Sequence, residues 1–470
     1  MTQVESSGII TKNNLNCRKL GFKRRLLKGG FLALKTYSVR AKLLLAITAV
    51  FAAALVSGCG GGGGQTPTKS VEQPSIAPSG ERSVRVSNYN NWDPLGETQE
   101  DTDQRLQILA LRSGVAIPES WDAPWVKPAV TPEAIKAINP NTKVYRLYTL
   151  SAKPDRDTDW NDPMNMSRMM FPITKAEIDA NDWWMRDANG NIIKEGASVW
   201  FVDVGKPGVK ELFLQRILER NAGKGFDGIL FDYWLPYFTK LSELTGCTLP
   251  VKGYSSDTNW QEKAWKPFIT YVMDGLHAAG YKVIGNCAGD LTEEVDPIIK
   301  FQRSKLDGVV YEQWMIDWPY KSSGWLSGDR IERRIYAFQN DPLDVWIGEY
   351  GLQLGVEDYD RKRLVSLAGY YIAVPQDDSK RSYHYYRSAK VFWDPLWDFS
   401  IGKPVETAVK ISGKYFWSRK FTQGIVLLNY EETESITFTL DKTYRDQNSK
   451  VYTGKVTLPP HTALILAAVQ

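Results

Sequence analysis

The His and Cys ligands that zinc prefers are scarce in this 470-residue chain, which holds only three His and four Cys. No pair of His, and no Glu with a His, has the spacing of a zinc hydrolase. A Gly-x-Ser-x-Gly elbow is also missing, which disfavours a serine hydrolase of the α/β type. No phosphate-binding glycine loop follows a predicted strand, since the glycine run at residues 60–64 lies in a linker. We therefore expect neither a metal site nor a cofactor.

The chain also lacks an excess of positive charge once its first 58 residues are set aside. Those residues contain ten of the 58 Lys and Arg but only one of the 54 Asp and Glu, which leaves 48 basic and 53 acidic residues in the remainder. The basic character of the whole chain thus comes from its N-terminus. It does not indicate a nucleic-acid partner.

The basic N-terminal stretch is followed by an apolar run at residues 43–56, which is broken only by Thr48. The run is shorter than the about 20 residues that a membrane-spanning helix needs. A basic region, a short apolar core and small residues after it predict a secretory signal peptide at residues 1–58. Residues 56–59 (Val-Ser-Gly-Cys) resemble the bacterial lipobox, which implies that Cys59 is lipidated and becomes the mature N-terminus. An ordinary secretory signal with an incidental Cys is the alternative.

A lipid on Cys59 would anchor the protein to a membrane of the bacterial cell envelope, on the periplasmic or the outer face. Residues 59–83 are rich in Gly, Pro, Ser and Thr and predict a flexible tether. Cys17 would be removed with the signal peptide. Cys247 and Cys287 then remain, and they could pair in an oxidising compartment or stay as two thiols.

Short apolar segments separated by amphipathic stretches predict an α/β fold, a (β/α)8 TIM barrel at residues 84–403. Strands that alternate with helical patterns form βαβ units and a parallel sheet. Eight such segments over roughly 300 residues suit a closed barrel, whose active site lies at the C-terminal strand ends. The predicted strands are 84–92, 143–151, 199–204, 228–234, 282–288, 307–314, 344–350 and 382–386.

The pattern changes after Pro404. Short alternating segments at 414–421, 424–429, 435–440, 450–455 and 463–467 are separated by turn residues. They predict a small C-terminal antiparallel β-sandwich at residues 404–470. We expect this domain to pack against the barrel.

Two carboxylates with aromatic neighbours follow predicted strands four and six. Asp232 ends the apolar run before Tyr233, and Glu312 follows Val309-Val310-Tyr311 in the same way. Most glycoside hydrolases use two such carboxyl groups, one on each side of the scissile bond. An apolar environment raises the pKa of a carboxyl group, which suits Glu312 to the role of the acid.

Other polar and aromatic residues near predicted strand ends are candidates for binding substrate. Asp203 and Glu349 are also the rivals for a catalytic role, and Arg146 could instead neutralise a buried carboxylate. Trp side chains stack on sugar rings, so we expect the four Trp beside strand ends to line the cleft. The candidates are Trp92, Asp93, Arg146, Tyr148, Asp203, Trp234, Asn286, Trp314, Trp318, Glu349 and His384.

Three stretches resemble a known group of enzymes: residues 226–232 (Phe-Asp-Gly-Ile-Leu-Phe-Asp), residues 201–204 with Pro207, and residues 184–190. The tail, at 417–429 and 458–461, is similar to the sandwich that closes many barrels of the same group. The group is the glycoside hydrolase families of the α-galactosidase superfamily, notably hypothetical glycosyl hydrolase family 15. The resemblance implies Asp232 as the nucleophile, at the end of strand four, and Glu312 as the acid/base, at the end of strand six.

The sequence therefore predicts a monomeric, lipid-anchored glycoside hydrolase that acts on a poly- or oligosaccharide. A barrel that binds glycan without catalysis, in a polysaccharide export or attachment assembly, is the alternative. The separation of the two carboxyl groups distinguishes these hypotheses, because an enzyme needs both groups facing one pocket, about 5–10 Å apart.

Overall fold

The computed structural model describes residues 83–88, 98–118, 130–154, 171–196, 199–286, 296–317, 324–352, 356–385 and 392–469. The predictions for the signal peptide, most of the tether, Cys59, Trp92, Asp93, Cys287 and Trp318 lie outside these residues. Residues 77–470 belong to one compact unit.

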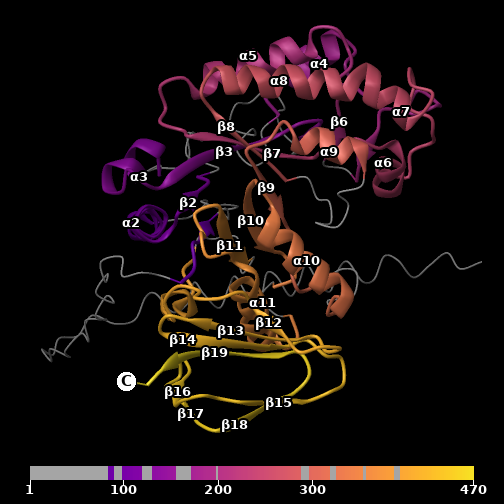
Figure 1. Ribbon diagram of the computed structural model, residues 1–470. Helices are drawn as coiled ribbons and strands as arrows, with labels where there is room; N and C mark the ends of the chain where they lie inside the picture. Colours follow the sequence, from indigo (N-terminus) through magenta and orange to yellow (C-terminus); the bar gives the residue numbers. More distant parts are fainter. Residues whose placement is uncertain are drawn as a thin grey trace, which may run out of the picture. The chain divides into compact units, whose positions relative to one another are not determined.

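A parallel sheet of eight strands forms the centre of this unit (Figure 1). The strand order is β1-β2-β3-β7-β8-β9-β10-β11, and the first strand also meets the last, through a parallel bridge between Val86 and Tyr383. The sheet therefore closes on itself, which confirms the predicted (β/α)8 barrel. The strands are β1 (Ser87–Asn88), β2 (Val115–Ala116), β3 (Lys143–Thr149), β7 (Gly228–Asp232), β8 (Lys282–Gly285), β9 (Gly308–Tyr311), β10 (Asp344–Glu349) and β11 (Arg381–Tyr385).

Helices separate most of the strands and cover the outer face of the sheet. In α10, the buried residues Ile331, Arg334, Ile335 and Phe338 recur every three or four positions, so one face packs on the barrel while the other meets solvent. The main crossover helices are α2 (Gln99–Gln107), α3 (Pro132–Ile138), α5 (Val209–Asn221), α8 (Lys266–Ala278), α9 (Pro297–Arg303), α10 (Gly328–Asn340) and α11 (Tyr359–Ala373).

The interior of the barrel is filled by large apolar side chains. Tyr145 of β3 packs edge-on against Trp346 of β10, with ring centroids 4.9 Å apart, although these strands are not neighbours in the sheet. Such a contact is possible only through the inside of the barrel. Because side chains alternate along a strand, Arg146 and Tyr148 must point outward, towards the helices.

One predicted barrel strand is wrong and one real strand escaped prediction. Residues 199–204 contribute β6 (Val199–Phe201), which pairs antiparallel with β4 (Ala152–Pro154) and β5 (Lys194–Glu195) in a separate three-stranded sheet. The second barrel strand is β2, whose two residues are too few for a hydrophobic pattern. The two errors cancel, so Asp232 still ends the fourth strand and Glu312 still follows the sixth.

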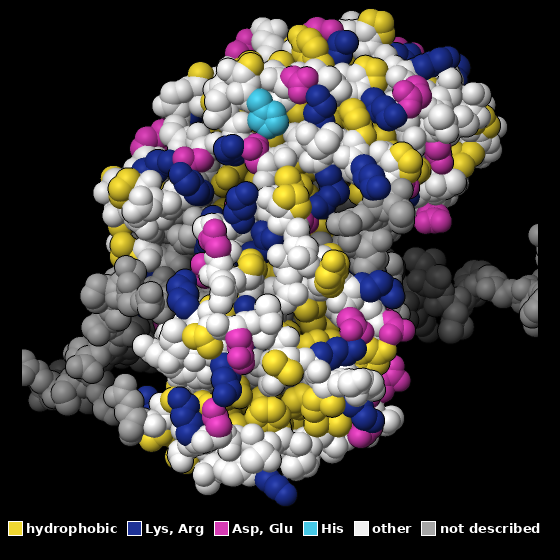
Figure 2. All heavy atoms as spheres, in the orientation of Figure 1, with side chains coloured by type: hydrophobic (Ala, Val, Ile, Leu, Met, Phe, Trp, Pro, Cys, Tyr) yellow, Lys and Arg dark blue, Asp and Glu magenta, His cyan; other side chains and the backbone are white. Residues whose placement is uncertain are grey.

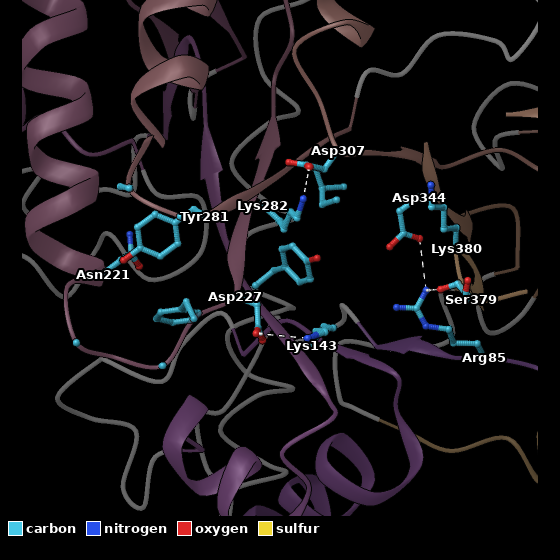
Figure 3. A pocket seen from close by; sticks show the side chains of 17 residues that line it. Arg85, Lys143, Asn221, Asp227, Tyr281, Lys282, Asp307, Asp344, Ser379 and Lys380 are labelled. Carbon is cyan, nitrogen blue, oxygen red and sulfur yellow. Dashed lines mark hydrogen bonds and ion pairs between the residues drawn. The ribbon is translucent and has the colours of Figure 1, made fainter. Parts of the chain in front are cut away.

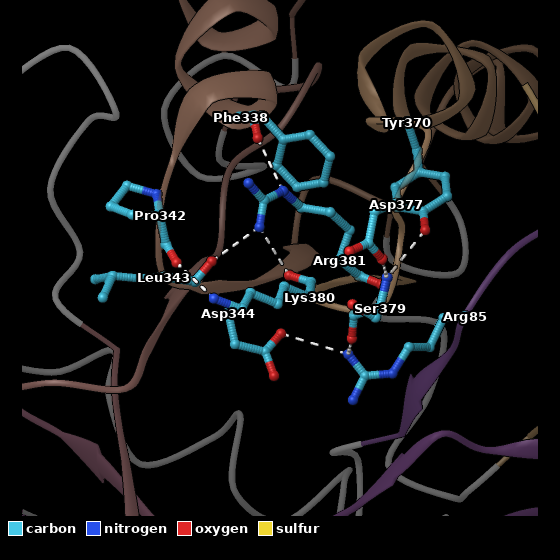
Figure 4. A network of polar contacts seen from close by, with 10 residues as sticks. All are labelled: Arg85, Phe338, Pro342, Leu343, Asp344, Tyr370, Asp377, Ser379, Lys380 and Arg381. Atoms are coloured by element: carbon cyan, nitrogen blue, oxygen red, sulfur yellow. Dashed lines mark hydrogen bonds and ion pairs between the residues drawn. The ribbon is translucent and has the colours of Figure 1, made fainter.

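Polar contacts fasten the seam between the first and last strands (Figure 4). The Arg85 guanidinium donates to the Ser379 carbonyl at 2.9 Å and lies 3.4 Å from the Asp344 carboxylate. Arg381 is buried beside them and donates to the carbonyls of Phe338 and Leu343 at 2.9 and 2.8 Å. Backbone carbonyls that would otherwise be unsatisfied at this end of the barrel thus gain partners.

The residues after the barrel form antiparallel sheets, as predicted. Two sheets enclose a core that includes Phe416, Leu427 and Leu466. One sheet has the order β12 (Val409–Lys410), β13 (Phe416–Phe421), β14 (Gly424–Asn429), β19 (Thr462–Ala468), β16 (Tyr444–Arg445) and β17 (Val451–Tyr452), and β15 (Ile436–Thr439) pairs with β18 (Lys455–Leu458) in the other.

This region also contacts the barrel. Buried Arg419 of β13 donates to the carbonyls of Tyr371 and Ile372 near the end of α11, at 3.0 and 3.1 Å. The hydroxyl of Tyr430 donates to the carbonyl of Met315 at 2.6 Å. Met315 follows β9, so the C-terminal region supports a loop at the C-terminal end of the barrel strands.

The surface carries both signs of charge. On the face shown in Figure 2, Lys and Arg side chains are interspersed with Asp and Glu over the barrel and over the C-terminal sheets. Within the described residues, we find no helix with the length and apolar character needed to cross a bilayer.

Candidate active site

The carboxylates of Asp232 and Glu312 meet at the C-terminal end of the barrel. Asp232 ends β7, Glu312 follows β9, and Asn286 follows β8, the strand between them. The side-chain amide of Asn286 donates to Oδ1 of Asp232 at 3.1 Å and to Oε1 of Glu312 at 2.7 Å. Both oxygens bond the same nitrogen, so they are at most about 6 Å apart, the sum of the two lengths.

The position of Asn286 follows from the sheet. Its backbone N–H donates to the carbonyl of Phe231 at 2.7 Å, which continues the ladder between β7 and β8. Its side chain is buried, and both of its neighbours are carboxylates that only accept hydrogen bonds when ionised. The NH2 group must therefore face the pair. Asn286 was predicted as a substrate ligand, and the structure gives it a bridging place between the two acids.

Burial changes the acidity of Asp232. Removal from water raises the pKa of this carboxyl to about 6, despite the hydrogen bonds from the Tyr233 N–H and from Asn286, which lower it. The nearby negative charge of Glu195 raises it further. Asp232 is thus poised to change its protonation state near neutral pH.

Glu195 and Tyr233 are site residues that the sequence did not reveal. The Tyr233 N–H donates to Oδ1 of Asp232 at 2.7 Å, the negative charge of Glu195 raises the pKa of Asp232, and burial raises the pKa of Glu195 itself. Glu195 belongs to β5, in the three-stranded sheet inserted between β3 and β7. The turn signal Asn189-Gly190 predicts a hairpin at residues 183–195, but such a signal does not indicate over which end of a barrel the hairpin folds.

Glu349 is fully buried and holds the loop that begins at Glu312. Its carboxylate accepts the backbone N–H of Met315 at 2.7 Å and of Ile316 at 3.3 Å, and the hydroxyl of Ser366 at 3.1 Å. Burial raises the pKa of Glu349 to about 7. With its oxygens occupied by protein donors, Glu349 supports the loop and is not placed to act as a rival catalytic acid.

Replacing Glu349 by Ala should destabilise the protein by about 2–4 kcal/mol, because buried N–H groups lose their acceptor and a cavity remains. Glu349→Gln keeps one acceptor oxygen, so its free energy of unfolding should decrease clearly less. Urea unfolding of both variants measures the difference. Equal stability of the Ala variant and the unmodified protein would show that the loop does not depend on this carboxylate.

The other rival acid, Asp203, does not follow a strand of the barrel. It follows β6 and is buried, where it accepts the Tyr254 hydroxyl at 2.7 Å and the Gly205 N–H at 3.1 Å. Desolvation raises the pKa of Asp203. The prediction that it ends a barrel strand is wrong, because β6 belongs to the inserted sheet, and Asp203 and Glu349 share no partner.

Arg146 and Tyr148 fasten a helix to the barrel. The Arg146 guanidinium donates to the carbonyl of Arg220 at 3.2 Å, and the Tyr148 hydroxyl accepts from the Asn221 side chain at 3.0 Å. Both partners lie at the end of α5, on the outer face of β3. The prediction that these two residues contact substrate is therefore wrong, since alternation along β3 turns them away from the mouth.

His384 of β11 packs among aromatic rings. Its ring lies 5.6 Å from that of Phe392 and 6.0 Å from that of Trp397. Burial lowers the pKa of His384 to about 3, so the ring is neutral at physiological pH. A contact between His384 and substrate stays a prediction.

Trp234 and Trp314 are core residues. Trp234 is 5% exposed and donates to the carbonyl of Phe231 at 3.0 Å, and Trp314 is 0% exposed and packs against Phe338. A sugar ring can stack only on an exposed aromatic face. The prediction that these two Trp line the cleft is therefore wrong.

A cavity of about 740 Å³ lies at the opposite end of the barrel, where the strands begin (Figure 3). Its acidic groups already have cationic partners, in the pairs Lys143–Asp227, Lys282–Asp307 and Arg85–Asp344. In (β/α)8 barrels this end contributes stability, and catalysis occurs at the other. Among the described residues, no group of three or more potential ligands could hold a metal ion.

The chain matches one protein family, and its similarity to solved structures is distant. The profile described as hypothetical glycosyl hydrolase family 15 matches residues 136–425. No curated protein shows a significant match. Among solved structures, the chain is similar to a maltogenic α-amylase, AmyB, from Thermotoga neapolitana, at 11% identity and a TM-score of 0.44, over 83% of this chain and 97% of that one. A xylosidase from Aspergillus niger is 10% identical, with a TM-score of 0.42 over 83% and 64% of the two chains.

Proposed function

The chain belongs to hypothetical glycosyl hydrolase family 15, and from that premise we propose that it cleaves a poly- or oligosaccharide with Asp232 as nucleophile and Glu312 as acid/base. The observation that carries the proposal is the Asn286 amide, which bonds both carboxylates at once. Two carboxyl groups in one buried site are the minimum apparatus of most glycoside hydrolases. The assignment of the roles follows the resemblance to the α-galactosidase superfamily.

The upper bound of about 6 Å on the distance between Oδ1 of Asp232 and Oε1 of Glu312 favours a retaining mechanism. Retaining enzymes hold them about 5–5.5 Å apart, and inverting enzymes about 6.5–9.5 Å apart to admit a water. In the first step, Glu312 donates its proton to the glycosidic oxygen while Asp232 attacks the anomeric carbon, so that the leaving sugar departs as an alcohol. In the second, Glu312 takes a proton from water, the water oxygen bonds to the anomeric carbon, and Asp232 is released.

A barrel that binds glycan without cleaving it would not need this arrangement. Its acids could lie apart, and it would depend on exposed aromatic platforms, whereas Trp234 and Trp314 are buried. Incubating the purified protein with a glycan panel and measuring reducing ends tests the proposal. Release of sugar supports an enzyme, and binding without release under all conditions supports the non-catalytic alternative.

The rate should fall in acid because Asp232 must be ionised to attack. Burial raises its pKa to about 6, so the reactive carboxylate is present above that pH and is lost as the pH falls through it. We expect kcat/KM to decrease about tenfold for each pH unit below about 6. An acid limb near pH 4, the ordinary range of a solvated Asp, would contradict this account.

We further propose that Cys59 carries a lipid that holds the enzyme at a membrane of the cell envelope. The basic region, the short apolar run and the sequence at residues 56–59 support this proposal. Cys59→Ala should release the protein from membranes or block its processing. Normal processing and membrane retention of that variant in cell fractions would refute the anchor.

A further inference from the structure

The chain that follows Glu312 forms a small antiparallel hairpin at the C-terminal end of the barrel strands. Ile316 pairs with Trp325 in an antiparallel bridge, so residues 315–317 and 324–326 form its two arms. The first arm leads back to Glu312, and the second leads on to α10. We call these two arms the acid/base hairpin.

Met315 fastens the first arm to the barrel. Its N–H donates to the buried carboxylate of Glu349 at 2.7 Å, and its carbonyl accepts the N–H of Leu326 in the second arm at 3.4 Å. Its side chain lies against α11 at Gly369, where a Cβ atom would overlap the Met315 Cε. The position of the hairpin is therefore coupled to the body of the barrel at this residue.

Two residues of the C-terminal region, Tyr430 and His461, hold the same hairpin from the other side, and we call them the clamp. The hydroxyl of buried Tyr430 donates to the Met315 carbonyl at 2.6 Å. The ring of His461 stacks on that of Trp325, with centroids 4.5 Å apart and planes 7° from parallel. The two clamp rings also meet edge to face at 5.0 Å. Tyr430 thus holds the first arm, and His461 holds the second.

The backbone of His461 has an uncommon conformation. Its φ of 49° lies in the left-handed region, which residues with a side chain rarely adopt. Gly would occupy this turn between β18 and β19 without strain. Burial lowers the pKa of His461 to about 4, so a neutral ring makes the contact with Trp325. A strained turn that carries a stacked ring indicates a role for the side chain.

Glu312 depends on the hairpin because it lies just beyond the regular part of β9, which ends at Tyr311. Its carbonyl accepts the N–H of Tyr350 at 3.0 Å, and its carboxylate accepts the Asn286 amide at 2.7 Å. These contacts hold it towards the neighbouring strands. On its other side, the chain turns into the first arm of the hairpin.

We propose that Tyr430 and His461 are positioning residues for the acid/base: by holding both arms of the hairpin, they keep Glu312 where it can protonate the glycosidic oxygen. This inference rests on the proposed function and adds the C-terminal region to its machinery. A general acid must lie within hydrogen-bond reach of the atom that it protonates. A misplacement of about 1 Å can cost about a hundredfold in rate.

The test uses the full chain, an oligosaccharide that it cleaves on the glycan panel and a dinitrophenyl glycoside of the same sugar. A displaced Glu312 slows only the oligosaccharide, because a dinitrophenolate leaves without a proton. Tyr430→Phe removes only the hydroxyl, and His461→Asn removes the ring but tolerates the left-handed backbone. Each should lower kcat/KM about ten- to a hundredfold on the oligosaccharide and less than about threefold on the dinitrophenyl glycoside.

Tyr452→Phe and His277→Asn are the matched controls. Tyr452 of β17 also donates its hydroxyl, but to the carboxylate of Asp446 within the C-terminal region, at 3.0 Å. His277 lies at the exposed end of α8, 2.9 Å from Asp307. Both controls should keep the unmodified kcat/KM on both substrates. Circular dichroism and thermal unfolding of the four variants exclude a loss of fold as the cause.

The outcomes separate the inference from the proposed function. If Tyr430→Phe and His461→Asn slow both substrates alike or neither, while Glu312→Gln is slow on the oligosaccharide alone, the positioning role is wrong and the catalytic pair stands. A lower stability of the two clamp variants without a leaving-group effect would also overturn the role. If Glu312→Gln shows no dependence on the leaving group, the acid of the proposed function is itself wrong.

Discussion

Replacing Asp232 by Asn is expected to lower kcat by a factor on the order of 10⁶ while substrate binding persists, by analogy with a hydrolase that loses its nucleophile. The amide has nearly the volume of the carboxylate. Its oxygen can still accept the hydrogen bonds from Tyr233 and Asn286, so the site should keep its shape. The charge that attacks the anomeric carbon is lost. Steady-state kinetics and calorimetric binding of the same substrate measure the two effects.

Asp227→Asn is the matched control for this substitution. Asp227 immediately precedes β7, at the other end of the strand that Asp232 ends, and pairs there with Lys136 at 2.8 Å. Its replacement should leave the rate intact. Turnover by Asp232→Asn at the rate of the unmodified protein would eliminate Asp232 as the nucleophile, and retained activity in both variants would direct the search to another pair.

Replacing Glu312 by Gln should lower the rate by about 10²- to 10⁴-fold on substrates with a poor leaving group, because no proton reaches the glycosidic oxygen. Aryl glycosides with an acidic phenol as leaving group need little protonation, so the first step should largely recover on them. Hydrolysis of the glycosyl–Asp232 ester would then limit turnover, since water lacks its base. Comparing kcat/KM, which reports the first step, on a leaving-group series measures the effect.

Azide distinguishes a retaining mechanism from an inverting one. As a small anion it can attack a glycosyl–enzyme ester without help from a base, so it should accelerate the Glu312→Gln variant and yield a glycosyl azide of retained configuration. An inverting mechanism predicts no such product. Glu332→Gln, on α10, should behave like the unmodified protein. A kcat/KM of the Glu312→Gln variant that is low on all leaving groups alike would argue against Glu312 as the acid.

The barrel and the two carboxylates were predictable because their signals are local. An apolar run that ends in Asp232 places that residue at the C-terminal edge of a strand, whichever strands lie beside it. The same pattern places Glu312 at the end of β9. The count of strands was less secure, since β2 has only two residues and the segment around β6 is apolar without belonging to the barrel.

The aromatic residues were harder to place. Trp234 and Trp314 follow strand ends in the sequence. A residue at such a position can belong either to the cleft or to the core. In both places the indole packs into the core: Trp234 lies against Trp265, and Trp314 lies against Phe338. Neighbours from distant segments decide this orientation. A periodic pattern along the sequence carries no information about such neighbours.

The sequence by itself determined the type of fold and the edge of the sheet at which the acids lie, because alternation and apolar runs depend on residues close together in the chain. Only the tertiary structure decided that Asn286 joins Asp232 to Glu312 and that Glu349 holds a loop. These are hydrogen bonds, which require donor and acceptor within about 3 Å of each other. Barrel closure and strand register bring such atoms together from segments that are far apart in the chain.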